Sequence, residues 1–132
     1  MSILGKYVVV KVLSKFDDNL KPVYVSKEEA LTLDEYKDAK SNAFINSTYI
    51  LKKDSFEIVL KVKDDNMRNE AKKANVKFID EDTIIYQGMK AVIENGKYYV
   101  FDEKNPDDKA EITQNEDGTL SFMMLLILKK LD

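Results

Sequence analysis

The side chains with which this chain could perform acid–base or metal chemistry are carboxylates, because it contains no histidine and no cysteine. Three carboxylates follow one another at residues 80–82, and a second group comprises Asp102, Glu103, Asp107 and Asp108. Close carboxylates can bind a hard cation or divide into an acid and a base. Nucleophile–histidine machinery and cysteine-based zinc sites are excluded within this chain.

An EF-hand calcium loop does not fit these acidic residues. If Gly118 takes the glycine position of that loop, Thr113 and Met124 fall where carboxylate ligands are required. We therefore expect solvated loop carboxylates, no metal, no cofactor and no enzymatic activity. A carboxylate-dependent hydrolase stays open as a weaker alternative, because the sequence does not show which carboxylates face each other in space.

Aromatic and sulfur-containing side chains in the second half of the chain could enclose a ligand instead. In a small β-barrel, alternating residues point inward and either fill the interior or line a cavity, so both interpretations stay open. Under the ligand interpretation, the hydroxyl of Tyr86 or Tyr98 orients the ligand and Phe122 forms an apolar wall. The candidate ligand-binding residues are Tyr86, Met89, Tyr98, Phe101, Phe122 and Met124.

The composition is that of one domain spanning residues 1–132. Hydrophobic residues make up 44% and charged residues 34%, which is typical of a folded chain rather than a disordered one. The formal net charge is −3, and Arg68 is the single arginine among 21 basic residues, so bidentate phosphate recognition is largely missing. We expect no nucleic-acid partner and interpret the scattered lysines as solubilising.

The elements that must position these side chains are mainly β-strands, most clearly in the last third of the chain. Asn95-Gly96 and Asp117-Gly118 each lie between β-rich runs. This is the strongest short-range hairpin signal, because both central residues of a type I′ turn need positive φ. The pattern predicts an antiparallel β architecture.

Apolar alternation predicts further strands in the first two thirds. Residues 6–16 form a first strand with apolar side chains on both faces. Residues 42–63 are predicted to form a β-hairpin that turns at residues 52–55. Further strand signals lie at residues 76–79 and 83–86, with a bulge or bend at Gly88.

Short helices interrupt these strands. Ser26 and Glu29 match a capping box at the start of a helix over residues 26–39. In one interpretation, this helix is divided into two at residues 31–32. Good helix formers over residues 66–75 predict a second short helix.

The C-terminal segment, residues 119–131, is predicted as one long strand that is apolar on both faces. Such a strand promotes aggregation when it lies at an exposed edge. Pairing with the equally two-sided first strand closes a barrel and removes the edge. We therefore expect a mainly β domain, an antiparallel curved sheet or barrel with one or two short helices.

This order of elements resembles the calycin group, the small lipocalin-like and fatty-acid-binding proteins. Gly5 and Tyr7 resemble the Gly-x-Trp opening of that group with Tyr in place of Trp, and residues 117–120 lead into the closing strand. The resemblance covers the whole chain in outline and implies a barrel closed by its first and last strands. Lys129 and Lys130 stand where the fatty-acid-binding members carry an arginine pair and a tyrosine, so it does not extend to their carboxylate grip.

The helix over residues 66–75 departs from that family pattern, because it falls inside the expected ladder of hairpins. It is either an insertion or a sign of an open, curled sheet. Fold alone does not establish function in either case.

These observations favour non-catalytic binding of a small apolar or lipid-like ligand inside a barrel. The alternative is a protein-interaction module with a filled core, which contacts a partner or a second copy of itself through an exposed sheet face or edge. The start of the chain has no secretory pattern, and its longest apolar run, residues 122–128, is too short to span a bilayer as a helix. We expect a cytoplasmic protein without a membrane span.

Overall fold

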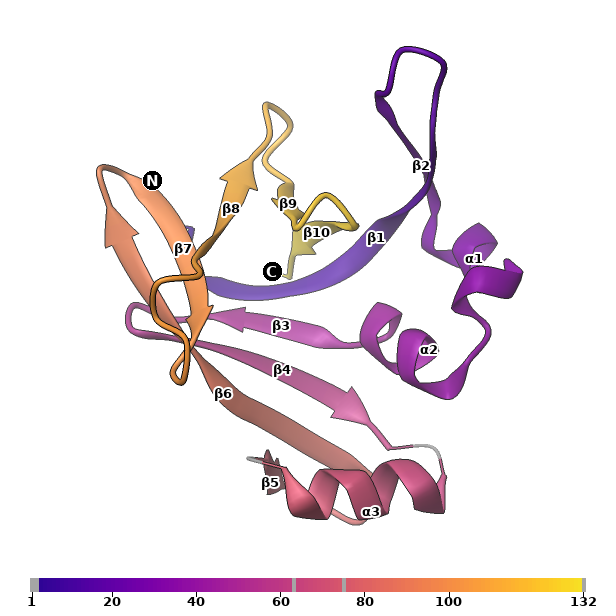
Figure 1. The fold of residues 1–132 in the computed structure, drawn as a ribbon, viewed down its shortest axis with the longest axis vertical. Coiled ribbons are helices and arrows are strands. Elements are labelled where there is room, and N and C mark those ends of the chain that lie inside the picture. Colours follow the sequence, from indigo (N-terminus) through magenta and orange to yellow (C-terminus); the bar gives the residue numbers. More distant parts are fainter. Residues whose placement is uncertain (1–2, 63, 75, 132) are drawn as a thin grey trace.

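Eight strands form a closed antiparallel β-barrel in the part of the chain that this computed structural model describes, residues 3–62, 64–74 and 76–131 (Figure 1). Each barrel strand pairs with the next one along the chain, and the last pairs with the first, so the predicted mainly β class is confirmed. The barrel strands are β1 (Gly5–Phe16), β3 (Thr48–Leu51), β4 (Ser55–Lys61), β6 (Thr83–Glu94), β7 (Lys97–Asp102), β8 (Ala110–Gln114), β9 (Leu120–Phe122) and β10 (Leu126–Lys130). Two strands extend the wall, β2 (Pro22–Ser26) beside β1 and β5 (Val76–Phe78) beside β6.

A β-bulge in β1 brings Val12 to the same face as Tyr7 and Val9. The register between β1 and β10 shifts between Val9 and Lys11. The extra residue changes the alternation, so Tyr7, Val9 and Val12 are all buried. Without the bulge, strict alternation would place Val12 on the face opposite Val9.

The apolar C-terminal segment folds back on itself, so the single long strand predicted for residues 119–131 is wrong. β9 and β10 pair antiparallel, with Leu126 opposite Phe122. Met123 and Met124 between them have positive φ values of 56° and 61°, as both central residues of a type I′ turn require. No Asn-Gly pair marks this turn, so the apolar pattern provides no reason to divide the segment. Its predicted pairing with the first strand is confirmed.

Four short helical segments interrupt the strands in the described residues. They are α1 (Lys27–Ala30), a 3₁₀ turn (Asp34–Tyr36), α2 (Ala39–Ile45) and α3 (Asp65–Lys73). The predicted helix over residues 26–39 is thus divided, and its N-cap is confirmed, since Ser26 Oγ accepts the backbone N–H of Glu29 at 3.2 Å.

Helix α2 occupies residues for which the pattern predicts a strand. Asp38 caps its start, where the carboxylate accepts the backbone N–H of Ser41 at 2.9 Å. The helix then continues to Ile45, so the strand predicted from residue 42 onward begins at Thr48. A helix cap outweighs the β-like pattern of these few residues, because it satisfies a backbone donor that a short helix otherwise leaves free.

Helix α3 and strand β5 form an insertion between β4 and β6, and the barrel closes without them. The helix predicted over residues 66–75 is confirmed in its main part. Asp64 caps it by accepting the backbone N–H of Met67 at 2.8 Å, and Ala71 is buried against the core. Figure 1 shows α3 and β5 together where β4 ends and β6 begins, away from the β9–β10 hairpin.

Three aromatic rings fill the barrel interior between β3, β4 and β9. The ring of Phe122 lies 6.0 Å from that of Tyr49 and 5.3 Å from that of Phe56, measured between centroids. All three side chains are buried. Inclined ring pairs at these separations are favourable.

The predicted hairpin turns and the predicted bulge are confirmed. Asn95 and Gly96 both have positive φ, 54° and 78°, between β6 and β7. At the other turn only Gly118 does, so the hairpin forms there with a different turn geometry. In β6 the register shifts opposite Glu57, which places Gly88 in a bulge.

Candidate functional site

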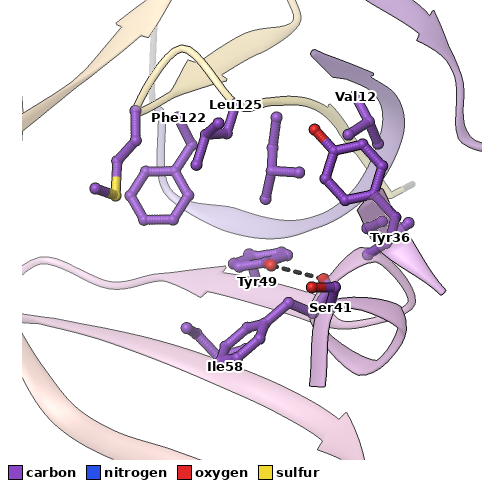
Figure 2. Close-up of a pocket in the computed structure, with 11 residues that line it drawn as sticks. Val12, Tyr36, Ser41, Tyr49, Ile58, Phe122 and Leu125 are labelled. Carbon is purple, nitrogen blue, oxygen red and sulfur yellow. Dashed lines mark hydrogen bonds between the residues drawn. The ribbon is translucent and has the colours of Figure 1, made fainter. Parts of the chain in front are cut away.

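An apolar hollow of about 340 Å³ opens at the end of the barrel beside α2 (Figure 2). We call it the first hollow. The β9–β10 hairpin lies on one side, α2 and the 3₁₀ turn on another, and β3 and β4 opposite the hairpin. Its volume falls within the range of small-molecule pockets. The side chains that shape it include Val12, Tyr36, Tyr49, Ile58, Phe122 and Leu125.

Helix α2 forms its side of the first hollow because the core anchors it at several points. Ala43 and Ile45 are buried, and Phe44 between them is 36% exposed and lines the hollow. The hydroxyl of Tyr49 donates to the carbonyl oxygen of Phe44 at 2.7 Å, drawn as the dashed line in Figure 2. The hydroxyl of Ser47 donates to the carbonyl oxygen of Ala43 at 2.6 Å. The backbone at Phe44 is therefore fixed while its side chain stays accessible.

The opposite side, the β9–β10 hairpin, is held by hydrogen bonds within its turn and to residues of β1 and β2. The N–H of Leu125 donates to the carbonyl oxygen of Phe122 at 3.1 Å across the turn. The N–H of Leu13 donates to the carbonyl oxygen of Leu125 at 2.8 Å, and the hydroxyl of Tyr24 donates to that of Met124 at 3.0 Å. These contacts hold the hairpin in place and leave apolar side chains at the rim.

The polar side chains that line the first hollow are either already hydrogen-bonded or uncharged. The hydroxyl of Tyr36 donates to the carbonyl oxygen of Leu13 at 2.5 Å, and that of Tyr49 is bonded to Phe44. Burial raises the pKa of both tyrosines, with the charge of Glu35 adding to the effect at Tyr36, so both stay protonated. Ser41 is the remaining polar side chain, and none of the described residues that line the hollow is charged.

Of the six predicted ligand-binding residues, Phe122 and Tyr86 line apolar hollows, but not the same one. Phe122 lines the first hollow. Tyr86 lines a second hollow of about 420 Å³, between α2, α3 and the inner face of β4, β5 and β6. Met124 lies in the β9–β10 turn with 53% of its surface exposed.

The other three predicted residues lie elsewhere. The hydroxyl of Tyr98 lies 2.7 Å from the carbonyl oxygen of Lys52 and 3.1 Å from that of Ser55, in the β3–β4 turn at the far end of these strands from α2. Its single proton is thus engaged by the backbone. Met89 packs against the core, and the ring of Phe101 lies 5.9 Å from Lys109 Nζ. The structure does not bring the six residues together in one site.

Sequence reasoning missed the part of the first hollow that α2 and the 3₁₀ turn supply. The sequence pattern places Tyr36 in the inward stripe of a helix and Phe44 in a strand, so it indicates neither as a site residue. The signal for α2 is Asp38, a good N-cap residue followed by the helix formers Ala39 and Lys40. Which cavity a helix lines depends on tertiary packing.

The acidic residues stabilise turns. The carboxylate of Asp80 accepts the backbone N–H of Asp82 at 2.8 Å, a bond that lowers the pKa of Asp80. Asp82 pairs with Arg68 at 3.1 Å, and Asp102 accepts the backbone N–H of Lys104 at 2.8 Å. Over the described ranges, no three or more acidic side chains lie close enough to hold a metal ion.

Helices α1, α2 and α3 are all too short or too polar to cross a membrane, and the described residues contain no helix that could do so.

Fold and site together define a small, closed, antiparallel β-barrel with an aromatic cluster in its interior and an uncharged, ligand-sized hollow at one end. Comparison of the chain with models of protein families, with curated proteins and with solved structures found no match.

Proposed function

We propose that this protein binds a small, uncharged apolar ligand without transforming it, in the first hollow at the α2 end of the barrel. The observation that carries the proposal is the combination of a ligand-sized volume, about 340 Å³, with a lining that has no charged side chain among the described residues. The driving force is transfer of apolar surface out of water, about 25 cal/mol per Å² before the cost of immobilising the ligand.

The state of the polar groups supports a neutral ligand. The hydroxyls of Tyr36 and Tyr49 already donate to backbone carbonyl oxygens. A charged ligand would lose its hydration and find no partner of opposite charge there, which is strongly unfavourable. An apolar ligand has no such penalty.

Two features support the further proposal of a calycin-like barrel. The barrel strands follow one another around the wall in chain order, and the first strand pairs with the last. The kinship itself stays a prediction, as does the absence of catalysis.

The experiment that tests the function is titration with the neutral dye N-phenylnaphthylamine, whose fluorescence rises in apolar surroundings. We expect saturable binding by the wild-type protein. Leu125→Asp places a charge in the first hollow and should weaken dye binding by at least about tenfold, or 1.4 kcal/mol. Ile93→Asp is the matched control, because Ile93 is 48% exposed against 46% for Leu125 and lines a different hollow. Absence of saturable binding, or equal loss in both variants, contradicts the proposal.

The second candidate function is protein interaction through the exposed tip of the β9–β10 hairpin. Met123, Met124 and Leu125 are consecutive and all largely exposed, which is an unusual arrangement for a surface turn. This candidate predicts self-association or partner binding that Met124→Ser weakens, while dye binding in the first hollow persists. Light scattering at increasing protein concentration measures self-association.

A further inference from the structure

The first and second hollows are neighbours that share part of their walls. Phe44 and Ile58 line both of them. The second hollow, of about 420 Å³, continues along the inner face of β4 and β6 and is covered by Met67 and Ala71 of α3. One layer of side chains therefore separates two apolar spaces that each have the volume of a small-molecule pocket.

The two shared side chains differ in their freedom to move. Ile58 is buried within β4, where its neighbours across the sheet are Tyr49 and Tyr86. Phe44, on α2, is 36% exposed. Exposed side chains change rotamer on the picosecond-to-nanosecond timescale, whereas packed ones are held by their neighbours.

The backbone that carries Phe44 need not move when its side chain does. Its carbonyl oxygen accepts the hydroxyl of Tyr49, and the adjacent Ala43 and Ile45 are buried. A rotation about the side-chain bonds of Phe44 is therefore enough to change the partition between the two hollows.

We propose that Phe44 divides one elongated site into two and sets the length of ligand that it accepts. The ligand class is an unbranched apolar chain with a small neutral polar end. This inference rests on the proposed function, because it assumes that the first hollow binds apolar molecules.

The charges at the second hollow support a neutral polar end. Lys40 and Glu70, of opposite sign, both line it, whereas no described residue that lines the first hollow is charged. A hydroxyl group can accept from an ammonium and donate to a carboxylate. The apolar chain of a long ligand then lies in the uncharged first hollow, and its hydroxyl end reaches Lys40 and Glu70 past the position of Phe44, whereas a short ligand lies in the first hollow alone.

The test is displacement of N-phenylnaphthylamine by unbranched alcohols from n-hexanol to n-dodecanol. For the wild-type protein, affinity should rise by up to about fourfold for each methylene until the chain reaches Phe44, and then level off. In Phe44→Ala the rise should continue to longer chains. We expect n-dodecanol to bind at least about tenfold more tightly to this variant than to the wild type, and n-hexanol to bind equally to both.

Further variants distinguish a specific role of Phe44 as the partition between the hollows from a general loosening of the fold. Phe44→Trp should move the limit to shorter chains. Ala74→Trp fills part of the second hollow, so adding it to Phe44→Ala should remove the gain for n-dodecanol. Phe16→Ala also removes an exposed aromatic ring, but one that lines neither hollow, and should leave the length limit unchanged.

The outcomes distinguish this inference from the function on which it rests. Binding of n-hexanol with a length limit that Phe44→Ala does not move overturns the role of Phe44 and leaves apolar binding intact. The role of Phe44 is equally overturned if Phe16→Ala moves the limit as far as Phe44→Ala does. Failure of the wild-type protein to bind the dye or any alcohol overturns both.

Discussion

The hydroxyl of Tyr49, in the barrel interior, donates a hydrogen bond of 2.7 Å to the backbone carbonyl oxygen of Phe44, in the last turn of α2. It links the aromatic cluster of the core to the helix that lines the first hollow. The same carbonyl oxygen, at the end of the helix, also accepts the backbone N–H of Ser47 at 3.3 Å.

Removal of this hydroxyl should therefore loosen α2 without emptying the core. We expect Tyr49→Phe to lower the free energy of unfolding by about 1 kcal/mol, as for a typical lost hydrogen bond. Urea denaturation measures this change, and hydrogen exchange should show faster exchange of the α2 amides. Tyr24→Phe removes the more exposed bond to Met124 and should change stability by about 0.5 kcal/mol or less.

The turn between β9 and β10 should become more stable with residues suited to positive φ. Met123 and Met124 adopt left-handed conformations that disfavour residues with a Cβ by about 1–2 kcal/mol each. We expect Met123→Asn combined with Met124→Gly to raise the free energy of unfolding by about 1 kcal/mol.

The β6–β7 turn provides the reciprocal experiment. It already carries Asn95 and Gly96 at the same turn positions, so Asn95→Met combined with Gly96→Met should lower stability. A β9–β10 variant that folds but gains no stability would show that the apolar contacts of Met123 and Met124 offset the strain.

The aromatic cluster should account for a large share of the stability. Phe56 is fully buried between Tyr49 and Phe122. We expect Phe56→Ala to lower the free energy of unfolding by about 3–5 kcal/mol, because the cavity lies where the barrel cannot collapse. Phe16→Ala, at an exposed site, should stay within about 0.5 kcal/mol of wild type in the same urea titration.

Glu57 should make stability depend on pH in the acid range. Its largely buried carboxylate accepts a hydrogen bond from Lys52 Nζ at 2.9 Å, which lowers its pKa, and Gln87 Nε2 donates at 3.1 Å. A carboxyl group whose pKa is lower in the folded state contributes stability above its unfolded pKa of about 4.3. That contribution is lost as the pH falls through the folded value.

The measurement is the melting temperature of wild type and Glu57→Gln between neutral pH and about pH 3. The wild type should be more stable at neutral pH, and the difference should shrink as the pH falls below about 4. Glu111→Gln, at an exposed position on β8, should show no such dependence. A constant difference between wild type and Glu57→Gln over the whole range contradicts the assignment.

The sequence predicted those parts of the fold that follow from local chemistry. Asn95-Gly96 specified a hairpin because few other residues tolerate two positive φ values. Ser26 specified a helix start because its hydroxyl caps a backbone N–H. The apolar two-sided segment predicted pairing of the last strand with the first, because an exposed edge of that kind is unfavourable.

The candidate site was much less predictable. Met123 and Met124 form a turn through a backbone conformation that neither residue favours, so it is sustained by the surrounding pairing of β9, β10 and β1. Phe44 reaches both hollows because α2 ends against Tyr49. Neither relationship has a sequence pattern of its own.

The sequence by itself determined a mainly β chain with no histidine or cysteine chemistry, and the positions of its clearest turns and caps. Only the tertiary structure decided that three aromatic rings meet inside the barrel and that the uncharged hollow lies at the α2 end. The reason is physical. Hydrogen-bonded caps and turns depend on a few neighbouring residues, whereas a cavity is the space left after distant segments have packed, and its shape depends on all of them together.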